Sequence, residues 1–221
     1  MIYSTKPCAL LTTSVLLAGC STNRATKEQY SGFLKDYSGL QDTVSATGQP
    51  ISRWIAPGFN IADYNKLIYN PIVYFPTPRP GPQVSQDTLN KVLAYTNNKL
   101  EQSLKSRFTL TKTPGPHTLV IRSAITAVNT SNESMQFYEV LPIAMVLAAG
   151  QVATGYRTQD TNIYFEAEVA DAVTGEVKMK VVRKGIGRQL DNAQQPVTLS
   201  TLKTVIDSLA TDARLFNTGK P

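Results

Sequence analysis

The chain has 221 residues, of which 42% are hydrophobic and 17% charged, so it can form a buried core and wholesale disorder is excluded. The formal net charge is +6, yet no run of lysine and arginine approaches a nucleic-acid-binding arm. We therefore expect no nucleic-acid partner. The length predicts one globular domain in addition to a targeting segment.

An export signal is predicted at the amino terminus. Lys6 supplies positive charge, and residues 9–18 form a mainly apolar stretch of about half the length that a membrane-spanning helix needs. The stretch ends at Gly19 and Cys20. We therefore predict that residues 1–19 are a signal peptide, cleaved between Gly19 and Cys20.

The sequence Leu17-Ala18-Gly19-Cys20 resembles the lipobox of bacterial lipoproteins. The resemblance implies a diacylglyceryl thioether on Cys20, acylation of its freed amine by a chain such as palmitate, and attachment to a membrane. Each buried acyl methylene contributes about 0.8 kcal/mol, so three chains anchor the protein firmly. Ser21 stands where sorting to the inner membrane uses Asp, so the resemblance favours the outer membrane, facing the periplasm.

Few side chains remain for metal, cofactor or nucleophilic chemistry. Cys8 leaves with the signal, and Cys20 carries lipid. His117 is the single histidine and is expected to cap a strand. We therefore expect no disulfide, no metal site and no cofactor. The sequence contains no phosphate loop, dinucleotide fingerprint or nucleophile elbow.

The first part of the mature chain is predicted to be loosely structured. Residues 20–30 are polar and aperiodic, which predicts a flexible, lipid-proximal tether before a single periplasmic α+β domain at residues 31–217. Residues 31–40 have apolar side chains at helical spacing, but two glycines shorten this element to a short helical turn docked on the domain. Residues 64–75 are rich in strand formers, and Pro71 bends that strand or confines it to an edge.

Two amphipathic helices are predicted. Ser85 caps a helix that runs to about Arg107, with apolar residues at spacings of three and four. Residues 199–216 form the second helix, with Thr198 at its cap. Residues 117–128 alternate and are apolar on both faces for part of their length, which predicts a central strand.

An uncharged stretch, residues 140–153, runs from Val140 to Ala153. It is too short to cross a bilayer. One interpretation is a buried helix or a hydrophobic crossover. The other is an exposed element that contacts the membrane or an envelope protein partner, because large exposed apolar patches mark such contacts.

Residues 162–172 and 176–187 predict the clearest β-hairpin, with Gly175 in the turn because glycine adopts a positive φ. The whole order of elements predicts an α+β fold. We expect two layers, a mostly antiparallel sheet with the two amphipathic helices packed on one face.

The hairpin register brings charged side chains together. A three-residue loop sets Glu168 opposite Lys180 and Ala170 opposite Lys178. Glu166 and Glu168 share a face with these lysines. We interpret the two carboxylates as a solvated ladder with lysine partners and not as a general acid–base pair.

Three stretches carry a family resemblance: Ser31-Gly32-Phe33-Leu34-Lys35-Asp36-Tyr37-Ser38-Gly39-Leu40, Thr154-Gly155-Tyr156-Arg157, and residues 166–177. They resemble an uncharacterised bacterial lipoprotein family, the one catalogued as domain of unknown function 3313. The resemblance covers roughly residues 31–216. It implies a compartment and a domain, and it assigns no catalytic residue.

We expect a non-catalytic, lipid-anchored module of the cell envelope that binds or scaffolds other components. One alternative is a subunit of an oligomeric envelope assembly, with residues 140–153 at its interface. The other is an enzyme without a recognisable motif, such as a hydrolase of envelope glycans. That alternative requires its candidate carboxylates to line one cleft: Asp36, Asp63, Glu133 and Glu139.

Overall fold

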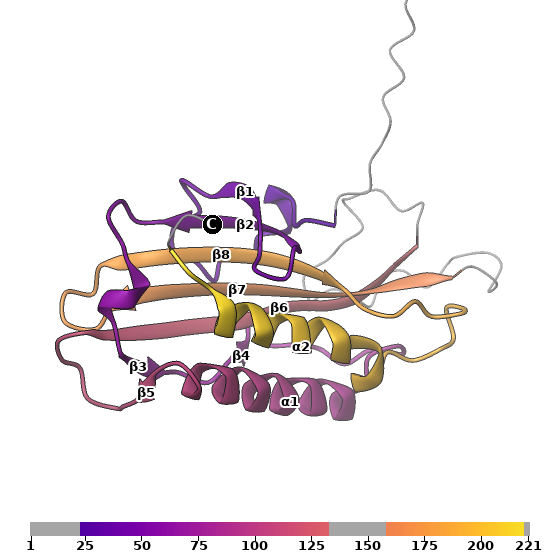
Figure 1. Ribbon diagram of the computed structural model, residues 1–221. Helices are drawn as coiled ribbons and strands as arrows, with labels where there is room; N and C mark the ends of the chain where they lie inside the picture. The colour runs from indigo at the N-terminus through magenta and orange to yellow at the C-terminus, as the bar shows by residue number, and fades with distance from the viewer. Residues whose placement is uncertain (1–22, 133–157, 219–221) are drawn as a thin grey trace, which may run out of the picture.

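The computed structural model describes residues 23–132 and 158–218 and contains one eight-stranded sheet (Figure 1). The strand order is β1-β2-β8-β7-β6-β3-β5, and β4 pairs with β6. The strands are β1 (Gln41–Val44), β2 (Pro50–Ile55), β3 (Lys66–Tyr69), β4 (Val73–Tyr74), β5 (Thr109–Leu110), β6 (Thr118–Asn132), β7 (Gln159–Asp171) and β8 (Val177–Ile186).

The long strands β6, β7 and β8 form the centre of the sheet, and β1 and β2 extend it with antiparallel pairing. On the other side β3 and β4 run parallel to β6. The predicted strand at residues 64–75 is therefore two short strands interrupted around Pro71, since proline cannot donate to a ladder. The predicted central strand is confirmed as β6, which has neighbours on both edges.

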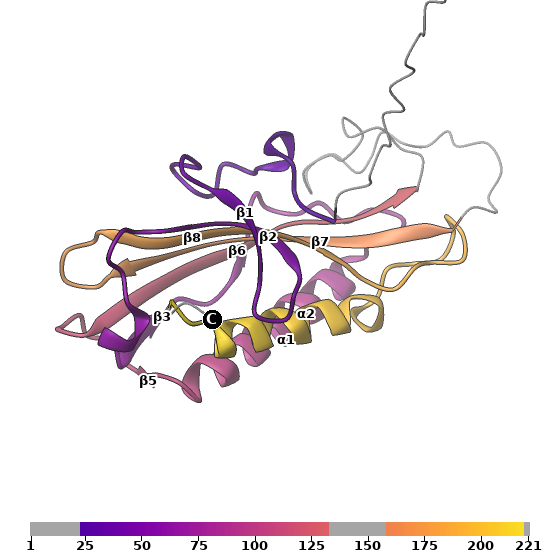
Figure 2. The ribbon, with the colours of Figure 1, turned by 45° about the horizontal axis from the view of Figure 1, so that its top comes forward.

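Two helices, α1 (Gln86–Lys105) and α2 (Leu199–Leu215), lie side by side on one face of the sheet (Figure 2). Ser85 caps α1 as predicted, because its hydroxyl accepts a hydrogen bond from the Thr88 N–H at 3.1 Å. Their apolar stripes meet the sheet in the main core, where Leu89, Val92, Leu202 and Ile206 are at most 1% exposed. The predicted α+β arrangement of helices on one face is confirmed.

Two glycines at the end of β8 allow α2 to approach the sheet. A Cβ on Gly185 would overlap the Val205 side chain of α2. A Cβ on Gly187 would overlap the main-chain oxygen of Thr201. The Gly185-Ile186-Gly187 sequence therefore serves close packing between layers.

The amino-terminal segment, residues 24–40, lies on the opposite face of the sheet (Figure 2). Residues 31–40 form turns and no helix, because Gly32 and Gly39 adopt φ of +85° and +76°. A 3₁₀ turn, η1 (Lys27–Gln29), precedes them, and Ala25 is 5% exposed. The packed body therefore begins earlier than the predicted boundary at residue 31.

The hairpin of β7 and β8 is confirmed, with Gly175 at φ +71° in its turn. Glu168 lies opposite Lys180 as predicted. Ala170 lies opposite Val177 and not opposite Lys178, because a bulge shifts the register beside Val169. The short hairpin of β1 and β2 was not predicted, because β1 is polar and largely exposed.

Candidate functional site

On the face away from the helices, Glu166 of β7 is only 1% exposed. Its carboxylate accepts hydrogen bonds from the Ser31 N–H at 2.8 Å, the Leu34 N–H at 3.4 Å and the Tyr37 hydroxyl at 2.5 Å. All three partners donate to Glu166, and an ionised carboxylate is a group that only accepts hydrogen bonds. The predicted solvated ladder is therefore wrong at Glu166, because the amino-terminal segment covers it.

The Tyr37 hydroxyl, which donates to Glu166, has a raised pKa. Burial is the main cause that raises the pKa of Tyr37 to about 12, and the hydrogen bond to Glu166 adds to it. The Tyr37 ring also stacks on Tyr30 with centroids 4.6 Å apart. Tyr37 therefore joins the amino-terminal segment to Glu166 through its hydroxyl and packs within the segment through its ring.

Lys180 of β8 makes the second attachment. Its Nζ is buried and donates to Asp36 at 2.8 Å and to the Ser38 carbonyl at 2.9 Å. It also lies 4.9 Å above the Trp54 ring. The hydrogen bond from Lys180 holds the pKa of Asp36 well below its ordinary value. Lys180 was predicted to pair with glutamates, but its carboxylate partner is Asp36.

A cavity of about 120 Å³ lies between the sheet and the two helices. Its walls are almost entirely apolar. The apolar lining comes from six strands or helices and their flanks: Ile51, Ile72, Leu100, Ile121, Phe165, Ala167, Met179, Val181, Leu209, Ala213 and Phe216. Ala167 lies on β7, in the middle of the sheet, and is still only half-buried, because it borders this cavity.

A buried ion pair forms part of the lining of this cavity. Arg183 of β8 and Asp212 of α2 form this pair, with side chains 4% and 12% exposed. Arg183 also donates to the Ser208 hydroxyl at 3.0 Å. Desolvation lowers the pKa of Arg183, and the adjacent Asp212 carboxylate opposes that shift. The two charges cancel, so this side of the cavity carries no net charge.

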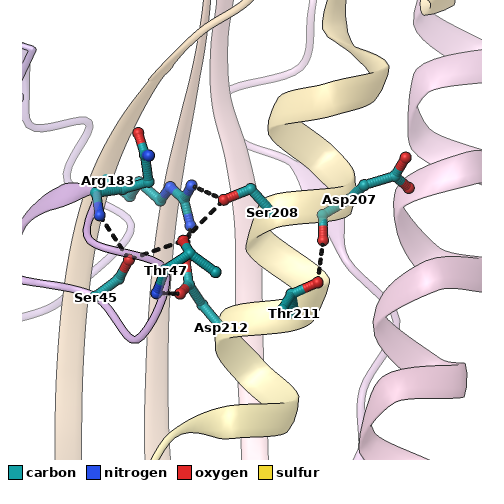
Figure 3. A network of polar contacts seen from close by, with 8 residues as sticks. Ser45, Thr47, Arg183, Asp207, Ser208, Thr211 and Asp212 are labelled. Carbon is teal, nitrogen blue, oxygen red and sulfur yellow. Dashed lines mark hydrogen bonds and ion pairs between the residues drawn. The ribbon is translucent and has the colours of Figure 1, made fainter.

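The loop between β1 and β2 is attached to the same ion pair (Figure 3). The Thr47 N–H donates to Asp212 at 2.6 Å, and the Thr47 and Ser208 hydroxyls lie 3.0 Å apart. Ser45 and Ala46 of this loop line the cavity. The hairpin that extends the sheet therefore also encloses the cavity.

Two features of the lining remain polar. Ser123 Oγ and Arg183 Nε are buried and have no hydrogen-bond partner within the described part of the chain. Arg53 lies over the Phe216 ring at 5.3 Å; both are partly exposed, and Ala46 is exposed. The lining therefore reaches solvent at these three residues, as it also does at other partly exposed positions such as Met179 and Ala213. Burial lowers the pKa of Arg53 below its ordinary value.

The candidate carboxylates of the hydrolase hypothesis are not brought together. Asp36 lines a hollow with Trp54 and Lys180, whereas Asp63 lines a different hollow with His117 and Asp171. Glu133 and Glu139 lie outside the described residues, as do Gly19, Cys20 and residues 140–153.

His117 follows a turn and adopts φ +56°, an uncommon value for a residue with a side chain. Its Nδ1 lies 2.7 Å from the Asp63 carbonyl oxygen, so Nδ1 carries the proton and donates. Main-chain N–H groups of Asn65 and Lys66 donate to the His117 carbonyl oxygen. His117 thus lies directly before β6, as predicted, and tethers the start of that strand.

Among the described residues, no three or more metal-binding side chains lie together in an arrangement that could hold an ion. Within the same ranges, no helix is both long and apolar enough to cross a membrane.

The buried ion pair was missed at the sequence level, although the positions of Arg183 and Asp212 could have predicted it. Arg183 continues the alternation of Met179 and Val181, so it falls on the apolar face of β8. Asp212 follows Leu209 by three residues and precedes Phe216 by four, so it falls on the apolar stripe of α2. A charge of each sign on facing apolar surfaces predicts a buried pair.

The fold and these contacts define a two-layer α+β protein with a covered outer face and an interlayer cavity. Residues 29–213 match the profile of a family described as "Protein of unknown function (DUF3313)". The chain belongs to this family.

The chain is 47% identical to the uncharacterised lipoprotein YdcL of Escherichia coli strain K12, over 92% of both chains. The YdcL of E. coli O157:H7 matches with the same identity and coverage. Among solved structures, the PelC dodecamer from Paraburkholderia phytofirmans matches with 12% identity and a TM-score of 0.35, over 74% of this chain and 94% of that chain. Likenesses at that level support no conclusion, and we draw none from them.

Proposed function

We propose that this chain is a lipoprotein of the cell envelope, held by acyl chains on Cys20 in the outer membrane and facing the periplasm. There its body acts as a non-catalytic binding or scaffolding module. The observation that carries the proposal is the lipobox-like sequence that ends at Cys20, followed four residues later by the first residue of a packed body. The relative named a lipoprotein supports the same assignment.

The spacing between Cys20 and the body supports a position close to the bilayer. Arg24 pairs with Asp42 at 3.1 Å and donates to the Thr43 carbonyl at 3.3 Å. The four residue steps from Cys20 to Arg24 span at most about 14 Å, since an extended chain advances about 3.3–3.6 Å per residue. A lipid on Cys20 would therefore hold the body within about 14 Å of the membrane surface.

Attachment of the amino-terminal segment supports a mechanical role for Glu166 and Lys180. Both are buried on the face that the segment covers, and both bind it through several hydrogen bonds. A force applied to the lipid anchor would be transmitted to the sheet through these hydrogen bonds. Such a connection suits a module that holds a partner near a membrane.

The character of the cavity supports binding over catalysis. Its walls are apolar, and the charges of the Arg183–Asp212 pair at its side neutralise each other. The carboxylates Asp36 and Asp63 lie in separate hollows. Of the two interpretations of residues 140–153, a buried element or an exposed contact with an envelope protein partner, the second is the one that would serve this role.

Membrane fractionation on a density gradient tests the proposed location. The wild-type chain should band with the outer membrane, whereas Ser21→Asp should shift toward the inner membrane and Ser21→Thr should not. Cys20→Ser should leave an uncleaved precursor. Normal processing of Cys20→Ser, or wild-type protein in the soluble fraction, would contradict the proposal.

A further inference from the structure

We propose that the cavity between the sheet and the two helices binds the apolar chain of a small anionic amphiphile, of which a fatty acid is the simplest, with its carboxylate at Arg53. This inference deepens the proposed binding role and rests on it. It assigns a ligand class to a site that lies on the face opposite the amino-terminal segment.

The size of the cavity limits its occupant to a slim group. The volume of about 120 Å³ is close to that of an apolar cavity of about 150 Å³ that binds benzene. A chain end fits such a space, but a whole phospholipid does not. The rest of the molecule and its head group must therefore lie at the opening.

The lining favours an apolar chain. Aliphatic and aromatic side chains from β2, β6, β7, β8, α1 and α2 surround the space. The half-buried state of Ala167 and Val181 leaves apolar surface on the helix side of the central sheet. A bound chain would remove that surface from water, with a gain of about 25 cal/mol for each Å².

The charges near the cavity favour an anionic head at its opening and not inside. Within the cavity Arg183 is neutralised by Asp212. Arg53 has no acidic side chain at ion-pair distance within the described residues, and its guanidinium stacks on Phe216. A guanidinium binds a carboxylate through two parallel hydrogen bonds, so Arg53 is suited to hold the head group.

Photo-crosslinking of the full-length lipoprotein in detergent-free lipid nanodiscs tests the inference. The probe is decanoic acid with a diazirine at its terminal carbon, and mass spectrometry locates the labelled residues. We expect label on the cavity lining, such as Met179 or Leu209. Mapping by residue separates this site from probe that only dissolves in the lipid.

Two variants and two matched controls define the site. Ala213→Leu fills the cavity from α2 and should reduce labelling at least fivefold, whereas Ala94→Leu on the exposed face of α1 should leave it unchanged. Arg53→Gln should reduce labelling by the acid probe several-fold, whereas Arg79→Gln at an exposed position should not. A decanol diazirine probe, which lacks the charge, should label Arg53→Gln as well as wild type.

The inference is overturned if the wild-type cavity takes no label, or if Ala213→Leu is labelled as strongly as wild type. Equal loss of acid and decanol labelling in Arg53→Gln would overturn the assignment of the head group. Far-ultraviolet circular dichroism and melting temperatures confirm that each variant is folded. An unlabelled cavity in a protein acylated on Cys20 refutes this inference and leaves the proposed function intact.

Discussion

At the scale of single residues, Glu166 binds the amino-terminal segment through three hydrogen bonds. Its partners lie about 130 positions away in the chain, so no local pattern announces them. The alternation of β7 correctly places Glu166 on the face without helices. The turns at Gly32 and Gly39 cover that face. The glycines allow the turns to be predicted from the sequence, but the docking of these turns on Glu166 cannot be predicted in the same way.

Glu166→Gln should destabilise the protein by about 2–3 kcal/mol, because hydrogen bonds to a charged group contribute about 1.5–3 kcal/mol and the amide nitrogen cannot accept. Urea denaturation measures this loss, and limited proteolysis should reveal earlier cleavage in residues 24–40. Glu168→Gln on the same strand is the control. Its pair with Arg122 is 3.4 Å long and partly exposed, so the expected loss is below about 1 kcal/mol.

If both substitutions cost the same, or if proteolysis of the segment is unchanged in Glu166→Gln, the assigned role of Glu166 is wrong.

Tyr37 predicts a dependence on alkaline pH. Its pKa is raised to about 12 in the folded protein, against about 10 in an unfolded chain. The stabilisation is therefore complete below pH of about 10 and is lost as the pH rises from there through about 12. The stability difference between wild type and Tyr37→Phe should therefore be constant up to a pH of about 10 and shrink between about 10 and about 12. Denaturation curves that give a constant difference over the whole range would contradict it.

At the scale of elements, the strands and helices with strong local periodicity were predictable. The apolar stripes of α1 and α2 and the alternation of β7 and β8 each define an element without reference to the rest of the chain. The β1–β2 hairpin was not predictable in this way, because β1 has no alternation and Pro50 begins β2. Its place depends on pairing with β8 and on docking to α2.

That docking rests on the Arg183–Asp212 pair. Asp212→Ala should cost about 3–5 kcal/mol, since it leaves a buried guanidinium without its counter-charge and frees the Thr47 N–H. The double variant Arg183→Met/Asp212→Leu should cost clearly less, because an apolar pair of similar volume carries no desolvation penalty. Thermal and urea unfolding of the three proteins provide the comparison. A double variant no more stable than Asp212→Ala would show that the charge itself is not the cause.

The cavity could not be predicted from the sequence, because it depends on how the two layers pair. Its lining residues look like ordinary core positions, and Ala167, Leu209 and Ala213 all follow the expected periodicity. A cavity arises where the facing side chains are too small or too far apart to meet, and that property belongs to the pairing of two layers. Within the described residues, Ser123 Oγ and Arg183 Nε of the lining are buried without a hydrogen-bond partner, but such atoms also occur elsewhere in the protein.

At the scale of the whole molecule, an extended sheet bears helices on one face and the amino-terminal segment on the other (Figures 1 and 2). In our proposals, the face with the amino-terminal segment connects to the membrane and the face with the helices holds a ligand. Composition and element order predicted the α+β class. They could not predict the covered outer face, because that depends on contacts between the first and last thirds of the chain.

Mass spectrometry of the amino-terminal peptide of the mature protein tests the central claim most directly. We predict a peptide that begins at Cys20, lacks residues 1–19 and carries a diacylglyceryl group on sulfur and an acyl chain on its amine. A protein that keeps Met1, or a peptide whose Cys20 carries no fatty acid, would contradict the account.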